Sequence, residues 1–476
     1  MNGPLDRLAK RRHVSSLLLL EEPACRCTWT RTRLAMFERG GTMRFAWMKT
    51  PVAGTLLAAV LFSCSSDEGS DEGPVKSTYV IDTFNVALAG SFVPYEKERR
   101  GPVMEAVASL DADVVCIQEA WRKQDKDDLV AAVKDRFPHV VRFEHDFESE
   151  VDDPADRDGN VPPVPTTPPC GAEGTREKFD AVLQCLVDKC STIPGSRDGK
   201  VNSASCAEDQ CFLEAAPLLS GTEDDKRCYG CAVTSLPEDT LGKIENKCTT
   251  NPKAALAFDG QSGVMILSRY PLVNAEDWVL PGTWNRRVIL RATARLPAGE
   301  VDVYCNHLTP VFFDMAFPYT GDYSEGLMGP EAWAAEQKLQ VEKLHAYLLE
   351  HSAGRKAIIL GDFNAGHEHR VDDRMITRAE GEEAMKLLEQ HYVEALLPDY
   401  TPACTYCSSN VLTGLTKEWE SAWVDHIFLH GIPAESVLSS ERTFVEGSLV
   451  VDNNGEELEV PVSDHYGMRA TISLRP

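Results

Sequence analysis

Apolar and polar positions along this chain alternate between two periods, one typical of strands and one typical of helices. Apolar runs rich in β-branched residues predict buried strands in both halves, at residues 79–86, 113–118, near 140, 264–268, 287–296, 301–308, 358–360, 423–430, 448–452 and 468–474. Helical spacing recurs between them, at 102–111, 127–137, 331–352 and 382–391. This mixture, with a hairpin turn at 297–299, predicts an α+β fold of two packed sheets covered by helices.

The alternation breaks at residues 150–255, which open with a Pro- and Asp-rich stretch and hold eight of the fifteen cysteines. We interpret 150–255 as an insertion into a domain that spans 78–476. In an oxidising compartment such an even cluster indicates disulfides, although eight cysteines allow 105 pairings. Zinc is the alternative, because Cys228 and Cys231 have ligand spacing. Disulfides are favoured, since the segment contains no second C-x-x-C and no His.

The cysteines outside this segment fall into two kinds. Cys404 and Cys407 are close enough in sequence to predict a further disulfide. Cys116 and Cys305 lie within predicted strands, and we expect them to be buried free thiols.

The N-terminal region predicts export. Residues 48–63 have a positive start, an apolar core of 11 residues and a small residue before Cys64. The stretch resembles the bacterial lipobox, so we expect a lipoprotein signal peptide, a membrane-attached lipid on Cys64 and a flexible tether at 64–77. An ordinary signal peptide or a short anchor is the alternative, and the apolar core is too short to span a bilayer. Residues 1–47 show no fold pattern, which suggests a mis-assigned start upstream of the true one.

The net charge of the chain bears on which class of ligand it binds. The formal net charge is −26, and from Cys64 onward 38 Lys and Arg face 70 Asp and Glu, a net charge of −32. Proteins approach the phosphate backbone of nucleic acids with Lys and Arg, so this acidity disfavours a nucleic-acid ligand.

Polar residues able to bind metal or transfer a proton lie at or near the ends of five predicted strands. They are Asn85, Glu119, His307, the pair Asp362 and Asn364, and the pair Asp464 and His465. Each alone has another interpretation: Glu119 as a helix cap, His307 as a core histidine, the Asp362 segment as a solvated turn. Strand ends meet at a common edge of a sheet, so together these residues predict one site.

Seven stretches carry a resemblance to a known family: IDTFNVALAG, DADVVCIQEAW, GVMILSRYPL, VYCNHLTP, AIILGDFNAG, AWVDHIFLHG and VSDHYGMRA. In order and spacing the chain is similar to the endonuclease/exonuclease/phosphatase superfamily over 79–148 and 258–476, and it is nearest to the neutral sphingomyelinase-like branch. The resemblance implies a four-layer α/β/β/α sandwich of two mixed β-sheets. The cysteine-rich segment lies outside it.

The resemblance also implies a metal-dependent phosphoesterase in which water attacks phosphorus directly and in line. Mg²⁺, or alternatively Mn²⁺, would be held by Glu119 with the assistance of Asn85. Asp464 would be a further ligand or an electrostatic partner of the metal.

The remaining site residues receive catalytic roles from the same resemblance. His465 would take the proton of the attacking water, and Asp425 would orient its imidazole. Asp362 and Asn364 would position the water and the phosphoryl oxygens. His307 would bind a phosphate oxygen that gains charge in the transition state.

The chain departs from the family pattern at two positions. His426 stands where many members have Tyr, and Trp423 stands where many have Arg or Lys. The second departure implies that one phosphate contact is weaker. His367 and His369 suggest an additional metal, but we favour a surface loop. The basic run of Lys97, Arg99 and Arg100 is interpreted as a solvated helix start.

The substrate is left open between classes. Acidity, the predicted membrane tether and the aromatic stretch at 307–329 favour a lipid or small phosphodiester, as in a sphingomyelinase or phospholipase C. Equally, those aromatics could simply pack their loop onto the domain. The alternatives are a secreted or surface nuclease acting on DNA or RNA, and a catalytically silent surface binding protein. We expect an exported, monomeric protein of the cell envelope, periplasmic or at the surface, without an obligate protein partner.

Overall fold

A computed structural model describes residues 77–475, except 145–166, 191–202, 236–240, 314–316, 372–373, 401–402, 417–420, 447–448 and 454. The predicted signal peptide, Cys64 and nearly all of the tether lie outside the described residues, as does the Pro- and Asp-rich start of the predicted insertion. In the part of the chain that is described, no helix combines the length and apolar character needed to cross a bilayer.

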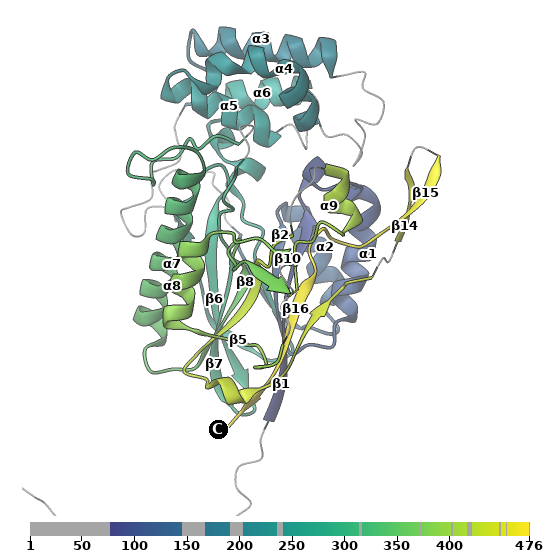
Figure 1. The fold of residues 1–476 in the computed structure, drawn as a ribbon, viewed down its shortest axis with the longest axis vertical. Helices are drawn as coiled ribbons and strands as arrows, with labels where there is room; N and C mark the ends of the chain where they lie inside the picture. Colours follow the sequence, from purple (N-terminus) through teal and green to yellow (C-terminus); the bar gives the residue numbers. More distant parts are fainter. Residues whose placement is uncertain are drawn as a thin grey trace, which may run out of the picture. The chain divides into compact units, whose positions relative to one another are not determined.

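Two six-stranded mixed sheets form the centre of the fold (Figure 1). The first has the order β13 (Val437–Thr443), β16 (Gly467–Leu474), β1 (Ser77–Leu88), β2 (Val114–Ala120), β4 (Met265–Ser268) and β3 (His139–Arg142). The second has the order β11 (Val393–Glu394), β12 (Asp425–His430), β8 (Ala357–Asp362), β7 (Gly299–His307), β6 (Arg287–Leu296) and β5 (Leu272–Leu280). In each sheet one pair is parallel, β1 with β2 and β7 with β8, and the other pairs are antiparallel. The predicted α+β class with two mixed sheets is confirmed.

Strands buried on both faces explain the layers. In β2, Cys116 faces the apolar core between the sheets, whereas Val115 and Ile117 face α1 (Glu96–Ser109) and α2 (Lys123–Val133). In β8, Leu360 likewise faces the inner core, whereas Ile359 faces α7 (Gly329–Ser352) and α8 (Glu382–His391). Side chains alternate along a strand, so each sheet contacts its partner sheet on one face and a helical layer on the other.

Smaller elements complete the fold. Two-stranded sheets pair β9 (His369–Val371) with β10 (Arg374–Thr377) and β14 (Leu449–Asn453) with β15 (Glu456–Val460). Short helices are α9 (Val411–Thr416) and the 3-10 turns η1 (Gly90–Phe92), η4 (Pro252–Ala255), η5 (Ala257–Gly260) and η6 (Ala434–Ser436).

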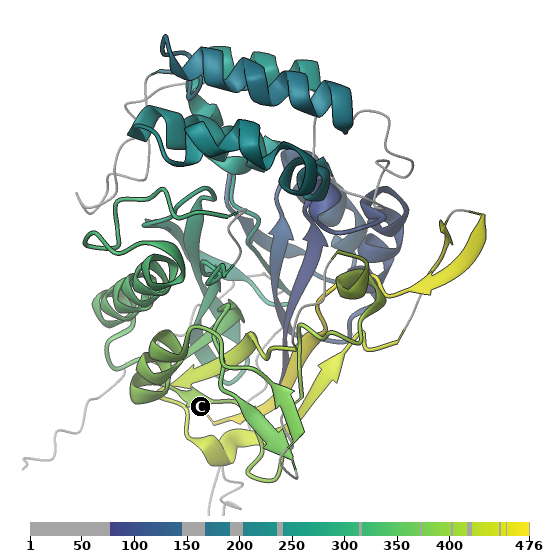
Figure 2. The same ribbon diagram turned by 45° about the horizontal axis from the view of Figure 1, so that its top comes forward.

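Among the described residues between β3 and β4, the chain forms four α-helices: α3 (Thr175–Lys189), α4 (Ser203–Leu219), α5 (Glu223–Ser235) and α6 (Leu241–Thr250). Because β3 pairs directly with β4, the chain leaves the sheet and re-enters it at neighbouring strands. This supports the predicted insertion, whose limits at 150 and 255 remain a prediction. Figures 1 and 2 show these helices beyond one end of the two sheets.

Disulfides connect this helical segment, as the cysteine spacing predicts. The bonds are Cys170–Cys228, Cys185–Cys211 and Cys231–Cys248, and Cys190 is disulfide-bonded as well. The predicted Cys404–Cys407 disulfide is also present.

The prediction of free thiols at Cys116 and Cys305 is wrong. The two residues form a disulfide with their Cα atoms 5.4 Å apart, and 189 positions separate them in sequence. Cys116 lies on β2 and Cys305 on β7, so the bond joins the two sheets through the inner core. The local pattern of each strand contains no sign of which residue faces it across the sandwich.

Arg99 is also misassigned by the sequence, because it is buried rather than solvated. Its guanidinium donates to the carbonyl oxygens of Pro94 (2.8 Å), Ala87 (2.6 Å) and Val462 (2.8 Å). These carbonyls satisfy a buried cation that would otherwise be costly. The contacts join α1, the end of β1 and the segment just before Asp464.

We expect the Cys116–Cys305 disulfide to contribute more to stability than Cys404–Cys407. Replacing both inter-sheet cysteines by Ala should lower the free energy of unfolding by about 2–5 kcal/mol, because the bond closes a long loop. The matched Cys404→Ala/Cys407→Ala variant, whose loop spans 3 positions, should lose less. Urea denaturation without reductant measures both, and equal losses would contradict the loop-length argument.

Candidate active site

One line of polar side chains crosses the end of the second sheet. Asp362, the last residue of β8, pairs with His307 of β7 on one side and with Asp425 of β12 on the other. Gly361 is required just before it, because its φ is +154° and an added Cβ would lie 2.1 Å from the carbonyl oxygen of Asn306. Strand register therefore sets three predicted site residues side by side.

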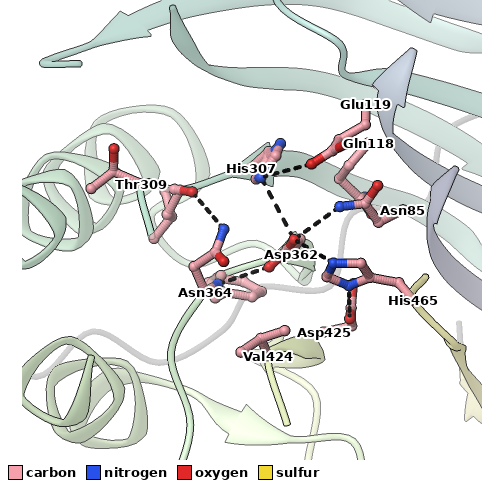
Figure 3. A network of polar contacts seen from close by, with 12 residues as sticks. Asn85, Gln118, Glu119, His307, Thr309, Asp362, Asn364, Val424, Asp425 and His465 are labelled. Atoms are coloured by element: carbon pink, nitrogen blue, oxygen red, sulfur yellow. Dashed lines mark hydrogen bonds and ion pairs between the residues drawn. The ribbon is translucent and has the colours of Figure 1, made fainter. Parts of the chain in front are cut away.

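The first sheet supplies Asn85 and Glu119 from the ends of β1 and β2. The Asn85 side-chain amide donates to Asp362 Oδ2 at 3.0 Å, across the gap between the sheets (Figure 3). Glu119 has a left-handed backbone, with φ at +61°, and its Oε1 lies 3.9 Å from His307 Nε2. A non-glycine residue in this region stores strain, which is common at functional sites.

The segment before β16 brings His465 to the same point. Ser463 Oγ donates to the Asn85 carbonyl oxygen at 2.7 Å and accepts from the His465 backbone N–H at 3.1 Å. His465 Nδ1 lies 2.9 Å from Asp425 Oδ2, and its Nε2 lies 3.9 Å from Asp362 Oδ2. The Asp425 carboxylate thus holds the imidazole of His465 through Nδ1, while Nε2 of the ring faces the centre of the site (Figure 3).

Asn364 turns back towards the Asp362 carboxylate. Its backbone N–H donates to Asp362 Oδ1 at 2.9 Å, and its side-chain amide donates to the carbonyl oxygen of Leu308 at 2.9 Å. Gln337 of α7 donates to the Asn364 carbonyl oxygen at 2.6 Å. The side-chain oxygen of Asn364 is therefore the group that this residue can offer to a ligand.

Burial and mutual repulsion alter the acidity of the site. Burial, together with the neighbouring Asp425 carboxylate, raises the pKa of Asp362 to about 7, against the lowering effect of His465. Burial and the Asp464 carboxylate both raise the pKa of Glu119. Burial, Arg287 and His465 hold the pKa of His307 well below 6.5, so His307 is a neutral ring at ordinary pH.

Two carboxylates facing one cavity fit a divalent cation. Glu119 and Asp464 both line the cavity, and their repulsion would be relieved by a hard cation that prefers oxygen ligands. Among the described residues, one group brings three side chains able to bind a metal within 4.8 Å of one another: Asp362, Asp425 and His465. We favour a cation between Glu119 and Asp464, because in the group of three His465 Nδ1 is already engaged by Asp425.

Two departures from the family pattern prove to be supporting residues. His426 is buried, with Nδ1 2.6 Å from Glu394 Oε1 and Nε2 2.8 Å from the Ala365 carbonyl oxygen. Trp423 Nε1 donates to the Asp425 carbonyl oxygen at 3.0 Å. Both side chains therefore hold backbone on either side of the site rather than contacting a ligand.

The histidines of the following loop are not part of this site. His367 lies 2.9 Å from Glu389 Oε1, and His369 packs beside the Trp423 ring. In the described residues neither belongs to a group of three metal-binding side chains, so the surface-loop interpretation is retained.

Sequence reasoning missed Arg287, at the start of β6. Its side chain is buried and lines the cavity with Glu119 and Asp362. Within the described structure its Nε has no hydrogen-bond partner, and the guanidinium carbon lies 5.8 Å from the Trp121 ring centre. Burial lowers its pKa to about 10, so it stays a cation. No local pattern separates it from the other basic residues of this strand.

These residues line a cavity of about 320 Å³, the size of a small-ligand pocket. Six predicted site residues reach it: Glu119, His307, Asp362, Asn364, Asp464 and His465. Asn85 and Asp425 stand behind them through the hydrogen bonds described above. The structure thus gathers all eight predicted site residues in one place.

Comparison with known proteins identifies the family. The model of the endonuclease/exonuclease/phosphatase family matches residues 83–465. The chain therefore belongs to this family, and it is an enzyme that hydrolyses phosphate ester bonds. Among curated proteins, none matches the sequence significantly.

Similar solved structures include sphingomyelinase C from Streptomyces griseocarneus, at 16% identity and a TM-score of 0.45, covering 83% of this chain and 99% of that one. A double mutant of beta toxin from Staphylococcus aureus with bound magnesium ions is 13% identical, with a TM-score of 0.44, and the match covers 83% of this chain and 99% of that one. An endonuclease/exonuclease/phosphatase protein from Beutenbergia cavernae is 14% identical, with a TM-score of 0.39, and the match covers 84% of this chain and 72% of that one. With such TM-scores, the assignment rests on the family match.

We predict that the pKa of the His465 imidazole is abnormally high in the metal-free protein. Burial alone would lower its pKa, but the carboxylates of Asp425 and Asp362 outweigh burial and raise it well above 6.5. Because the folded-state pKa is the higher one, this pair stabilises the fold fully below about pH 6.5 and loses that contribution as pH rises through the folded-state pKa. An NMR titration of the imidazole, assigned with His465→Asn, measures it. Asp425→Asn should lower the pKa, and a wild-type value at or below 6.5 would refute the interpretation.

Proposed function

We propose that this enzyme is an exported, Mg²⁺-dependent phosphodiesterase that hydrolyses its substrate by direct in-line attack of water. The observation that carries the proposal is the His465–Asp425 pair, which lies beside Asp362 at a cavity that Glu119 and Asp464 also line. A base held by a carboxylate stands beside carboxylates suited to a hard cation, which is the arrangement that metal-assisted phosphoester hydrolysis requires.

Glu119 would hold the metal, with Asn85 beside it and Asp464 as a ligand or electrostatic partner. Bound there, Mg²⁺ would act as a Lewis acid on the phosphoryl group and stabilise the leaving oxygen. Mn²⁺ is the alternative ion, since it also takes oxygen ligands.

The proton of the attacking water passes to His465 Nε2 as the new P–O bond forms, and the ester P–O bond breaks on the opposite side of phosphorus. Asp425 stabilises the imidazolium that results. Asp362 and Asn364 would position the water and a phosphoryl oxygen. Since His307 is neutral, it would contact a phosphate oxygen as a hydrogen-bond donor, and the leaving oxygen would take its proton from solvent or the imidazolium.

The substrate we favour is a lipid or small phosphodiester, as in a sphingomyelinase or phospholipase C. The strong negative charge of the chain supports this choice, as does the small number of cations at the cavity. Besides the two histidines of the site, the basic residues among those that line it are Arg287 and Arg378, and Arg378 forms an ion pair with Glu380. An extended polyanion would gain little from such a wall.

The cellular setting belongs to the same proposal. The disulfides indicate folding in an oxidising compartment. A lipid on Cys64 would attach the enzyme to a membrane of the cell envelope, with the enzyme acting as a monomer.

His465→Ala should lower kcat for phosphodiester hydrolysis by about 10²- to 10⁴-fold, because the water loses its base. The matched control is His367→Ala, which removes a histidine of the neighbouring loop outside the site. Steady-state kinetics on a panel of phosphodiesters measures both. Activity of His465→Ala equal to wild type would contradict the assigned role.

Removal of the metal should abolish turnover. EDTA is expected to stop hydrolysis and Mg²⁺ to restore it. Glu119→Gln should raise the Mg²⁺ concentration for half-maximal activity by about tenfold or more, since a charged ligand is lost. Glu383→Gln, which changes an exposed glutamate of α8, is the control and should match wild type. Full activity in EDTA would exclude a metal-dependent mechanism.

A direct comparison separates the lipid substrate from a nuclease. Release of phosphocholine from sphingomyelin vesicles and nicking of plasmid DNA are measured with the same enzyme, with and without EDTA. We expect EDTA-sensitive release of phosphocholine and little nicking. EDTA-sensitive nicking without phosphocholine release would favour the nuclease.

A further inference from the structure

The disulfide-bonded helices α3, α4 and α5 form one wall of the catalytic cavity. From these helices, the cavity is lined by Val182, Leu186, Phe212, Leu218, Ala232 and Val233 among others. None of the lining residues that this segment contributes is charged. At the same cavity the two sheets contribute the carboxylates and histidines described above.

Aromatic residues outside the helices extend this apolar wall. Phe312 and Phe317, from the loop after β7, line the cavity and stack with ring centres 4.7 Å apart. They pack, together with Trp284 and Trp333, against the core of the helical segment. The sequence left open whether these aromatics pack their loop or contact a substrate. Phe312 and Phe317 pack the loop and also face the cavity.

Disulfides hold the wall in place. Cys185–Cys211 joins α3 to α4, and Cys211 itself lines the cavity. Cys231–Cys248 joins α5 to α6, and Cys170–Cys228 fixes the start of the segment to α5. A wall that is already rigid loses little conformational entropy when a ligand binds.

We propose that this wall binds a long apolar ester arm of the substrate, so that the helical segment selects phosphodiesters that carry an alkyl or acyl chain. The inference rests on the proposed function, because it places the phosphate at the polar end of the cavity. An apolar chain against this wall removes apolar surface from water on both partners, which favours binding. A nucleotide or sugar arm would instead leave polar groups against a wall that offers few partners.

Phe212 gives the sharpest test. It lines the cavity from α4 and is 38% exposed, so it can be changed without opening the core. The next residue, Leu213, is 82% exposed and does not line the cavity. Phe212→Ser and Leu213→Ser are therefore matched variants on one helix.

Two substrates isolate the apolar arm: the methyl and the dodecyl esters of phosphocholine, the second used below its micelle-forming concentration. Both release phosphocholine, and they differ only in the alcohol that leaves. We expect wild type to have the higher kcat/KM with the dodecyl ester. In Phe212→Ser the dodecyl-to-methyl ratio of kcat/KM should fall about tenfold, whereas Leu213→Ser should keep the wild-type ratio. Phe212→Leu should retain most of it, and thermal melts check that each variant is folded.

The outcomes separate the two proposals. If wild type hydrolyses neither ester, the proposed function fails and the inference fails with it. If wild type hydrolyses both esters with equal kcat/KM, or if Phe212→Ser leaves the ratio unchanged, the phosphodiesterase stands and the apolar-arm site is overturned. An equal fall of the ratio in Leu213→Ser would also overturn it, because the effect would not belong to the cavity wall.

Discussion

The buried carboxylate of Asp362 is the contact on which the rest of this site depends. It accepts a hydrogen bond from Asn85 of the first sheet at 3.0 Å and from the Asn364 backbone at 2.9 Å. His307 Nε2 lies 3.6 Å from it. A buried carboxylate requires such donors, so the two sheets can pack closely at this end only when their polar strand ends meet. The same requirement that stabilises the packing therefore assembles the catalytic groups.

The surrounding structure keeps those groups in place through backbone contacts. Arg99 donates to carbonyl oxygens at the end of β1 and just before Asp464, and His426 holds the loop after Asp362. The Cys116–Cys305 bond joins the sheets inside the sandwich. None of these residues would contact a substrate. They limit the movement of the elements that do, which a site needs when reacting atoms must be aligned.

The sequence predicted much of this arrangement for a clear reason. Strand and helix positions follow from local periodicity, and α8 begins and ends at the predicted residues, Glu382 and His391. The site residues could be named because each lies at or near a strand end in a motif of its own, such as the Gly361–Asn364 stretch. The roles of those residues remain proposals, since gathering them in one cavity does not measure their chemistry.

By itself, the sequence determined the fold class and the positions of most elements, because these properties are written in local patterns. It also named eight candidate site residues from strand ends and from motifs that resemble the family. Only the tertiary structure decided which residues face one another across the sandwich. It turned two expected thiols into a disulfide, buried the guanidinium of Arg99 and placed Arg287 beside the carboxylates. It also made the disulfide-bonded helices a wall of the cavity. Each of these outcomes depends on contacts between residues far apart in the chain, and local periodicity carries no record of them.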